Sequence, residues 1–204
     1  MDITYDQEFV RVIDGVLAPE FCDHLCETFE SQSQWHRERP GDYARLIELD
    51  MRTTTSRLGR SFRKQPWLSA RGDYDWDQDC DHIMKVVLAQ TEQYRSRWDP
   101  LAMMPLDFAS EGLRMKCYRP NGHHEFKTHV DQACRESATR FLAFLFYLSD
   151  SDAGTEFVNQ GETVQARKGR LVMFPPNWQY PHRGLMPQDG KTKYIMSTYL
   201  HYAR

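Results

Sequence analysis

Three side chains in the second half of the chain could bind one divalent metal ion. His129 and Asp131 stand two residues apart in a run that predicts a β-strand, and side chains at positions i and i+2 of a strand point to the same face. A facial site needs a third protein ligand, and His182, just after Pro181, has the best setting among the other histidines. Two imidazoles and one carboxylate with open positions suit an iron(II) ion that must bind substrate and oxygen.

An isolated His-x-Asp pair is weak evidence, because short patterns often arise by chance. The alternative for this pair is a surface strand with polar residues. The alternative for His182 is a loop histidine whose hydrogen bonds are satisfied within the protein. The order of the surrounding elements therefore decides how much weight the metal hypothesis carries.

The first hundred residues predict one strand and two helices around a polar segment. The β-branched run at 9–17 predicts a strand, and a second helix is expected over about 75–98. Residues 33–72 show little periodicity, so we expect them to be irregular. The first helix opens at Pro19 and has an apolar stripe with a period of four, made of Phe21, Leu25 and Phe29.

From Leu113 onward, short β-rich runs are separated by Gly, Pro, Asn and Asp. This pattern of short strands separated by turns predicts a β-sandwich or β-barrel. Because two helices precede the runs, the expected fold is a mainly β sandwich backed by helices. The expected strands lie near 113–119, 125–131, 140–149, 155–159, 162–167, 170–174 and 192–202.

The net charge of −3 and the pI of about 6.2 exclude a globally basic nucleic-acid binder. One local exception is the arginine-rich segment from Arg37 to Arg71. The favoured interpretation of this segment is a solvated, irregular surface. The alternative is a basic rim that receives an anionic substrate.

Five cysteines without a C-x-x-C spacing favour reduced thiols in the cytosol over a secreted disulfide framework. The first residues have neither the basic nor the apolar region of a signal peptide. The longest apolar run, 141–148, is too short to span a bilayer. We therefore expect a soluble, cytoplasmic protein without membrane contact.

The second half of the chain resembles the prolyl-4-hydroxylase-like group of 2-oxoglutarate and iron(II) oxygenases. The family's motifs occur in order as MKCYRPNGHHEFKTHVD, FLAFLFYLSD, GTEF, KGRLVMFPP, the histidine at 182 and GKTKYIMSTYL. The resemblance covers about 113–202, and the N-terminal strand and helix loosely. It implies one oxygenase domain over 1–204, with helical support at about 18–100 and a cupin-like jelly-roll core, a double-stranded β-helix, at about 113–202.

The resemblance assigns the three metal-binding candidates as iron ligands, and it assigns Lys193 to the distal carboxylate of 2-oxoglutarate. A dianion in a partly dry barrel needs such a cation to offset its desolvation. Lys191, two residues away, is a competitor for this role. His123 and His124 are expected near the pocket mouth and not on the iron.

Four further residues receive roles from the same resemblance. Tyr147 matches a tyrosine that also binds the distal carboxylate, and Tyr118 matches one near the iron-proximal end of the cosubstrate. For both, the alternative is an ordinary core aromatic. Arg140 matches a substrate-contacting position, with a structural ion pair as the alternative, and Tyr199 matches an aromatic that lines the substrate side.

The implied activity is hydroxylation of an unactivated C–H bond with Fe(II), 2-oxoglutarate and O2, with ascorbate as a candidate reductant. The expected substrate is a prolyl, peptidyl or amino-acid-like molecule, and no nucleic acid is expected. Asp131 favours hydroxylation, because related halogenases carry a small residue there; desaturation is an alternative outcome. Three other interpretations stay open: a small-molecule biosynthetic hydroxylase, a cupin-like metal oxygenase without 2-oxoglutarate, and a β-sandwich binding module.

Overall fold

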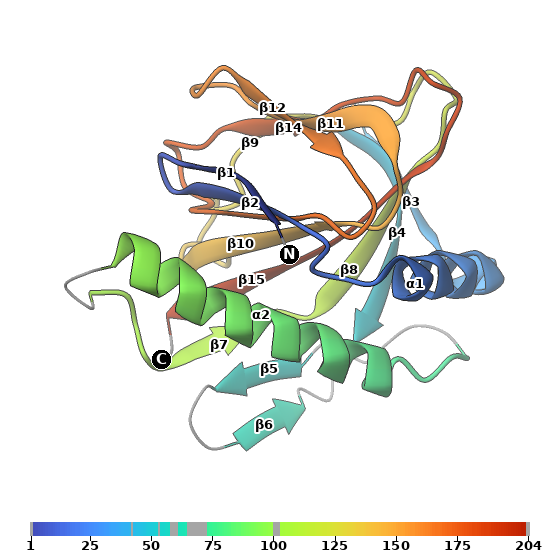
Figure 1. The fold of residues 1–204 in the computed structure, drawn as a ribbon. Helices are drawn as coiled ribbons and strands as arrows, with labels where there is room; N and C mark the ends of the chain where they lie inside the picture. Colours follow the sequence, from blue (N-terminus) through green and yellow to red (C-terminus); the bar gives the residue numbers. More distant parts are fainter. Residues whose placement is uncertain are drawn as a thin grey trace.

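A computed structural model describes residues 2–41, 43–52, 54–57, 61–64, 73–99 and 103–202. The chain is mainly β, and its strands form a curled antiparallel sheet consistent with a jelly roll, ordered β1-β2-β13-β10-β15-β8-β4-β9-β14-β11-β12 (Figure 1). The helices are α1 (Pro19–Ser31) and α2 (Asp77–Trp98), with a 3₁₀ turn at Ser33–Trp35. The strands are β1 (Asp2–Gln7), β2 (Val10–Asp14), β3 (Arg37–Pro40), β4 (Ala44–Arg52), β5 (Thr54–Arg57), β6 (Ser61–Lys64), β7 (Phe108–Ser110), β8 (Leu113–Tyr118), β9 (Glu125–His129), β10 (Arg140–Tyr147), β11 (Ser151–Phe157), β12 (Glu162–Ala166), β13 (Leu171–Phe174), β14 (His182–Gly184) and β15 (Lys193–Tyr202).

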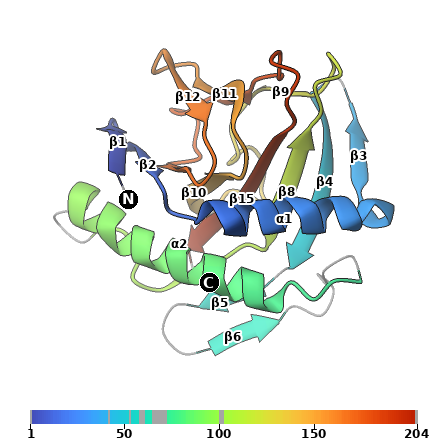
Figure 2. The same ribbon diagram turned by 45° about the vertical axis from the view of Figure 1, so that its right-hand side comes forward.

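The sheet folds over into two layers, and the helices cover the outer face of the larger one. The larger layer contains β2, β13, β10, β15, β8 and β4, and the smaller contains β9, β14, β11 and β12. Both α1 and α2 run across the larger layer on the side away from the smaller one (Figures 1 and 2). None of the described helices combines the length and the apolar composition needed to cross a bilayer.

Strand β10 shows why the core has two parts. Its sequence RFLAFLFY is apolar after the first residue, because both of its faces are buried. Leu142, Phe144 and Phe146 join the core between the sheet and the helices. The alternate residues join the core between the two layers, where Tyr147 is fully buried. The strand period of two thus builds both cores from one segment.

The segment expected to be irregular is largely β-structure, so that expectation is wrong. Strand β4 runs between β8 and β9 in the larger layer, and β3 pairs with it. Leu49 and Met51 of β4 pack under the helices, whereas Glu48 and Asp50 lie on the other face. Carboxylates at inward positions hide the apolar alternation that would have predicted a strand. Residues 42, 53, 58–60 and 65–71 of the basic segment lie outside the described residues.

Several shorter elements also differ from the expected ones. Strands β1, β7 and β14 were not predicted, and the strand expected at 125–131 ends at His129. Asp131 therefore lies beyond the strand that was predicted to carry it. The short strand β14 matters most, because His182 is its first residue.

Candidate active site

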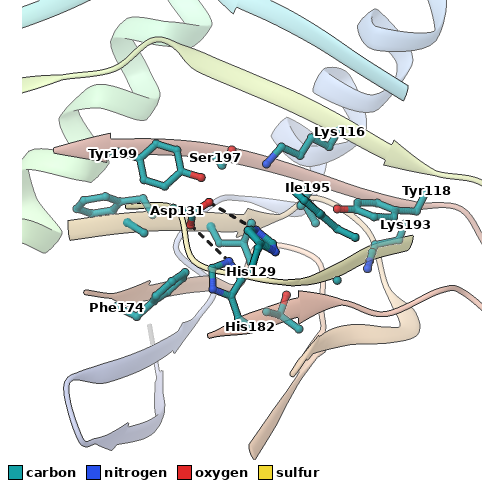
Figure 3. Close-up of a pocket in the computed structure, with 16 residues that line it drawn as sticks. Lys116, Tyr118, His129, Asp131, Phe174, His182, Lys193, Ile195, Ser197 and Tyr199 are labelled. Atoms are coloured by element: carbon teal, nitrogen blue, oxygen red, sulfur yellow. Dashed lines mark ion pairs between the residues drawn. The ribbon is translucent and has the colours of Figure 1, made fainter. Parts of the chain in front are cut away.

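The three metal-ligand candidates converge, although strand alternation does not bring them together. His129 of β9 and His182 of β14 are cross-strand partners in the antiparallel pair, a position in which side chains are neighbours. One Asp131 carboxylate oxygen lies 3.6 Å from His129 Nε2, and the other lies 3.4 Å from His182 Nε2 (Figure 3). One ligand atom from each residue lies within 4.8 Å of the others. The chain just after β9 bends so that Asp131 faces both rings.

The hydrogen bonds of the two imidazoles fit a metal site. His129 Nδ1 lies 2.8 Å from the Lys127 carbonyl oxygen, and His182 Nδ1 lies 3.1 Å from that of Tyr180. A carbonyl accepts only from a protonated nitrogen, so these contacts fix both Nδ1 atoms as donors. In neutral rings the Nε2 lone pairs then face the Asp131 carboxylate, and a cation between them resolves this repulsion. Backbone contacts of this kind orient metal-bound histidines.

Burial tunes the charges of the ligand candidates. Desolvation lowers the pKa of His182 to about 4, so its ring is neutral at pH 7 and its Nε2 can bind a metal. Burial alone would raise the pKa of Asp131, but the two imidazoles and Lys116 outweigh it and hold that pKa below its usual value. At neutral pH His182 therefore presents a neutral nitrogen and Asp131 a carboxylate. Together with the His129 imidazole they form the donor set typical of iron(II) oxygenases.

A pocket between the two layers opens onto this triad (Figure 3). Phe126 stacks on the His129 ring at 3.8 Å between centroids, and Phe174 meets the His182 ring edge-on at 4.9 Å. These aromatic rings fix the imidazoles and keep water away from one side of the site.

One end of the pocket holds Lys193, which is buried to 1% exposure. Its Nζ donates to the Leu185 carbonyl at 2.6 Å and lies 4.0 Å above the Tyr118 ring. Burial lowers its pKa to about 7, with Asp152 opposing the shift. The competitor Lys191 is exposed, and its Nζ lies 3.9 Å from an Asp189 oxygen.

Tyr118 also lines the pocket, and Tyr147 is set back behind its wall. A Cβ added to Gly184 would lie only 3.1 Å from the Tyr118 hydroxyl, so glycine permits this close approach of β8 and β14. The Tyr147 hydroxyl donates to Thr155 Oγ1 at 2.7 Å. Thr155 lines the pocket at this point, whereas Tyr147 does not.

Arg140 forms the structural ion pair that was the alternative to a substrate contact. It donates to both Glu111 oxygens at 2.6 and 2.9 Å and to the Asp131 carbonyl at 2.7 Å. Its guanidinium also stacks on the Tyr199 ring at 3.9 Å. Tyr199 lines the pocket on the side away from Lys193. Arg140 therefore supports the chain around Asp131 and the aromatic wall of the pocket.

Sequence reasoning missed several lining residues, and Lys116 is the most informative of them. It is 8% exposed and lines the pocket from β8. It stands two residues before Tyr118 on a predicted strand, so alternation could have placed both on one face. Thr155, Phe126, Phe174 and Ser197 were also not predicted.

His123 and His124 lie in the turn before β9, outside the metal-binding group found among the described residues. His124 Nδ1 accepts a hydrogen bond from the Arg119 backbone at 2.9 Å, and His123 is exposed. Neither histidine is among the pocket-lining residues.

Comparison with known families agrees with the site. Residues 113–201 match the family model of the 2OG-Fe(II) oxygenase superfamily. This stretch contains all three residues of the His-Asp-His group and the buried Lys193. Comparison with curated proteins finds no match.

Solved structures that share the fold include prolyl hydroxylases. A viral collagen prolyl hydroxylase from Paramecium Bursaria Chlorella virus-1 is 16% identical, with a TM-score of 0.63 over 98% of this chain and 99% of that one. A Pseudomonas putida prolyl-4-hydroxylase is 15% identical, with a TM-score of 0.64 over 97% and 95%. A Trichoplax adhaerens prolyl hydroxylase, in complex with a hypoxia inducible factor peptide fragment, is 14% identical, with a TM-score of 0.59 over 96% and 84%. The family match over residues 113–201 thus confirms the resemblance to the 2-oxoglutarate and iron(II) oxygenases, and the solved structures show that the fold is shared with prolyl hydroxylases.

Proposed function

We propose that this protein is an Fe(II)- and 2-oxoglutarate-dependent dioxygenase that hydroxylates an unactivated C–H bond of a prolyl, peptidyl or amino-acid-like substrate. The observation that carries the proposal is the convergence of His129, Asp131 and His182 on one wall of a pocket with a buried lysine at one end. A structural binding module has no need of an open ligand set beside an anion-binding cation.

Different residues of the chain would bind the iron and the cosubstrate. His129, Asp131 and His182 would hold the iron, with both Nδ1 atoms anchored to backbone carbonyls. Iron and 2-oxoglutarate, when bound, supply the oxidising chemistry that turns a C–H bond into an alcohol. Lys193 would bind the distal carboxylate of the cosubstrate, helped by the Thr155 hydroxyl.

The pocket walls would position the substrate and exclude water. Tyr199 lies beyond the triad from Lys193, so it would line the substrate side. A dry wall strengthens the charge interactions that orient both reactants. The prolyl or peptidyl part of the proposal rests on the shared fold with prolyl hydroxylases. Ascorbate would act outside these residues, as a reductant of iron.

The test is an anaerobic titration of the metal-free protein with iron(II) and 2-oxoglutarate, followed by their charge-transfer absorption. Wild type should show the band. His129→Ala should lose it, because one of three ligands is gone. His123→Ala is the matched control, since His123 is exposed and lies outside the pocket lining, and it should keep the band.

The other outcome points to a specific second candidate. If iron binds to wild type but 2-oxoglutarate produces no band, the cosubstrate assignment is wrong. The same three ligands would then serve a cupin-like oxygenase that does not use 2-oxoglutarate. Where the band forms, succinate release with free amino acids and with proline-containing peptides distinguishes the substrate classes.

A further inference from the structure

Lys116 is a second buried cation of the pocket and has no role in the reaction described above. It projects from β8, beside Ile195 of β15 on one side and Glu48 of β4 on the other. Figure 3 shows its side chain directed towards the space above His129 and Asp131. It therefore lies between the Lys193 end of the pocket and the Tyr199 end.

Within the described part of the chain, the Lys116 ammonium has no hydrogen bond and no ion pair within 4.0 Å. Its nearest ring, Phe126, is 5.7 Å away. The neighbouring Glu48 is already engaged by Arg39 at 2.8 Å. Burial of the ammonium without a hydrogen bond lowers the pKa of Lys116, and Asp131 and Glu48 oppose this shift only through space. An anion from outside the chain that bonds directly to the ammonium would stabilise its charged form.

The charges of the loaded site do not provide this anion. The carboxylate of Asp131 and the two charges of 2-oxoglutarate would be balanced by a divalent iron and by Lys193. Lys116 then remains as one uncompensated positive charge beside the metal. The cosubstrate therefore leaves this lysine free for another ligand.

The sheet beside Lys116 is also positively charged. Arg37, Arg39 and Arg114 surround Glu48 and Asp50, with contacts of 2.6 to 2.8 Å. Directly paired residues share a face of a sheet, and register places Glu48 opposite Lys116 and Asp50 opposite Arg114. Three guanidinium groups around two carboxylates give this cluster a net positive charge next to the pocket residue Lys116.

Resting on the function proposed above, we propose that Lys116 binds a carboxylate of the substrate, and that the protein acts on molecules with a carboxylate close to the reacting C–H bond. The carboxylate could be the free α-carboxylate of an amino acid or an acidic side chain in a peptide. Both sources present the same chemistry to the ammonium. Lys116 is then a specificity-determining residue.

The test compares acids with their amides on zinc-loaded protein saturated with 2-oxoglutarate, so that binding is measured without turnover. The probes are the protein amino acids against their C-terminal amides, and acetyl-Glu-Pro-amide against acetyl-Gln-Pro-amide. Binding is measured by ligand-observed NMR at up to 10 mM. Because a charge-assisted hydrogen bond is lost with the amide, at least one acid should bind about tenfold more tightly than its partner.

The variants separate this role from a structural one. Lys116→Met should abolish the preference for acids, Lys116→Arg should retain it, and Lys85→Met, a change at an exposed lysine of α2, should leave it unaltered. The 2-oxoglutarate Kd of Lys116→Met should stay within about twofold of wild type. This value also shows that the variant is folded.

Three outcomes would overturn the inference. One is an absence of acid preference across the whole panel, including an absence of binding. Another is a preference that survives in Lys116→Met. The third is a 2-oxoglutarate Kd that rises tenfold or more in Lys116→Met, which would assign the lysine to the cosubstrate. Failure of the function proposed above is distinct, because it appears as a missing iron charge-transfer band in wild type.

Discussion

The pocket contains two buried lysines on neighbouring strands, and their surroundings differ. Lys193 donates to a backbone carbonyl and rests on the ring of Tyr118. Lys116 faces the metal-ligand candidates without a hydrogen bond among the described residues and borders an arginine-rich sheet surface. Lys193 is thus held in one position by a backbone hydrogen bond, whereas the Lys116 ammonium has no such bond within the described ranges. This difference is what we expect if one end serves a fixed cosubstrate and the other selects the substrate.

The largest effect is expected from a change that removes the metal, because both the Lys193 end and the Lys116 side of the pocket depend on it. Asp131→Ala deletes the only carboxylate of the triad. Without metal neither end of the pocket can support turnover, so 2-oxoglutarate decarboxylation should fall by at least about 10³-fold. Iron content after mild reconstitution and succinate formation measure this. An Asp131→Ala variant with near-wild-type iron and turnover would show that the metal lies elsewhere.

Lys193→Ala should weaken only the binding of the cosubstrate. The loss of a charge-assisted bond should raise the 2-oxoglutarate Kd by about 10- to 100-fold, while iron affinity stays unchanged. Lys191→Ala is the matched control, because Lys191 is exposed and its removal should leave the Kd alone. The charge-transfer titration measures both variants. If Lys191→Ala raised the 2-oxoglutarate Kd and Lys193→Ala did not, Lys191 would be the residue that binds the cosubstrate carboxylate.

The pH dependence of 2-oxoglutarate binding is a second test of the role of Lys193. The pKa of Lys193 is lowered to about 7 by burial, and its proton is needed to bind a dianion. Above pH 7 the free protein loses this proton, so the 2-oxoglutarate Kd should rise by up to about tenfold per pH unit. Lys193→Arg should flatten this dependence, because guanidinium stays protonated.

The same pKa predicts how the cofactor-free protein responds to pH. The pKa of Lys193 is lower in the folded chain than the 10.5 of the free side chain. Between pH 7 and 10.5 the unfolded chain therefore binds more protons, so this residue adds stability as the pH rises. For the binding prediction of the preceding paragraph, the contradicting outcome is a 2-oxoglutarate Kd that stays constant from pH 7 to 9. That result would show that Lys193 is not the titrating anchor.

Arg140→Met tests whether this residue contacts substrate or supports the site. Its bond to the Asp131 carbonyl makes it a positioning residue, so metal affinity should fall about tenfold. The free energy of unfolding should fall by about 1–2 kcal/mol, because the pair with Glu111 is only partly buried. Arg183→Met, which removes the exposed pair with Glu156, is the control. A change in substrate KM with unaltered metal affinity would favour direct substrate contact.

The smallest effect is expected for Tyr147→Phe. Its hydroxyl donates to Thr155 and does not reach the pocket. The variant should lose about 1 kcal/mol of stability for one buried hydrogen bond, and the 2-oxoglutarate Kd should change by less than about threefold. Thermal unfolding and the same titration measure these values. A tenfold higher 2-oxoglutarate Kd would instead show that Tyr147 contacts the cosubstrate, as its motif predicts.

Several features of this protein follow from the sequence alone. The types and order of His129, Asp131 and His182 predicted a metal site, and the fold brings the three together. The apolar run of β10 and the β-rich run of β15 predicted strands that are present. The strand predictions succeed because β-forming runs bounded by turn residues are a local property that the sequence displays directly.

Other features were decided only by tertiary structure. His129 and His182 meet because β9 and β14 pair in one register, and no local pattern specifies which strands become neighbours. Glu48 and Asp50 can occupy a strand because arginines from β3 and β8 neutralise them. Lys116 became a binding candidate only when its surroundings were known. Burial and charge compensation depend on residues far apart in the chain, so they become visible only once the sheet has closed.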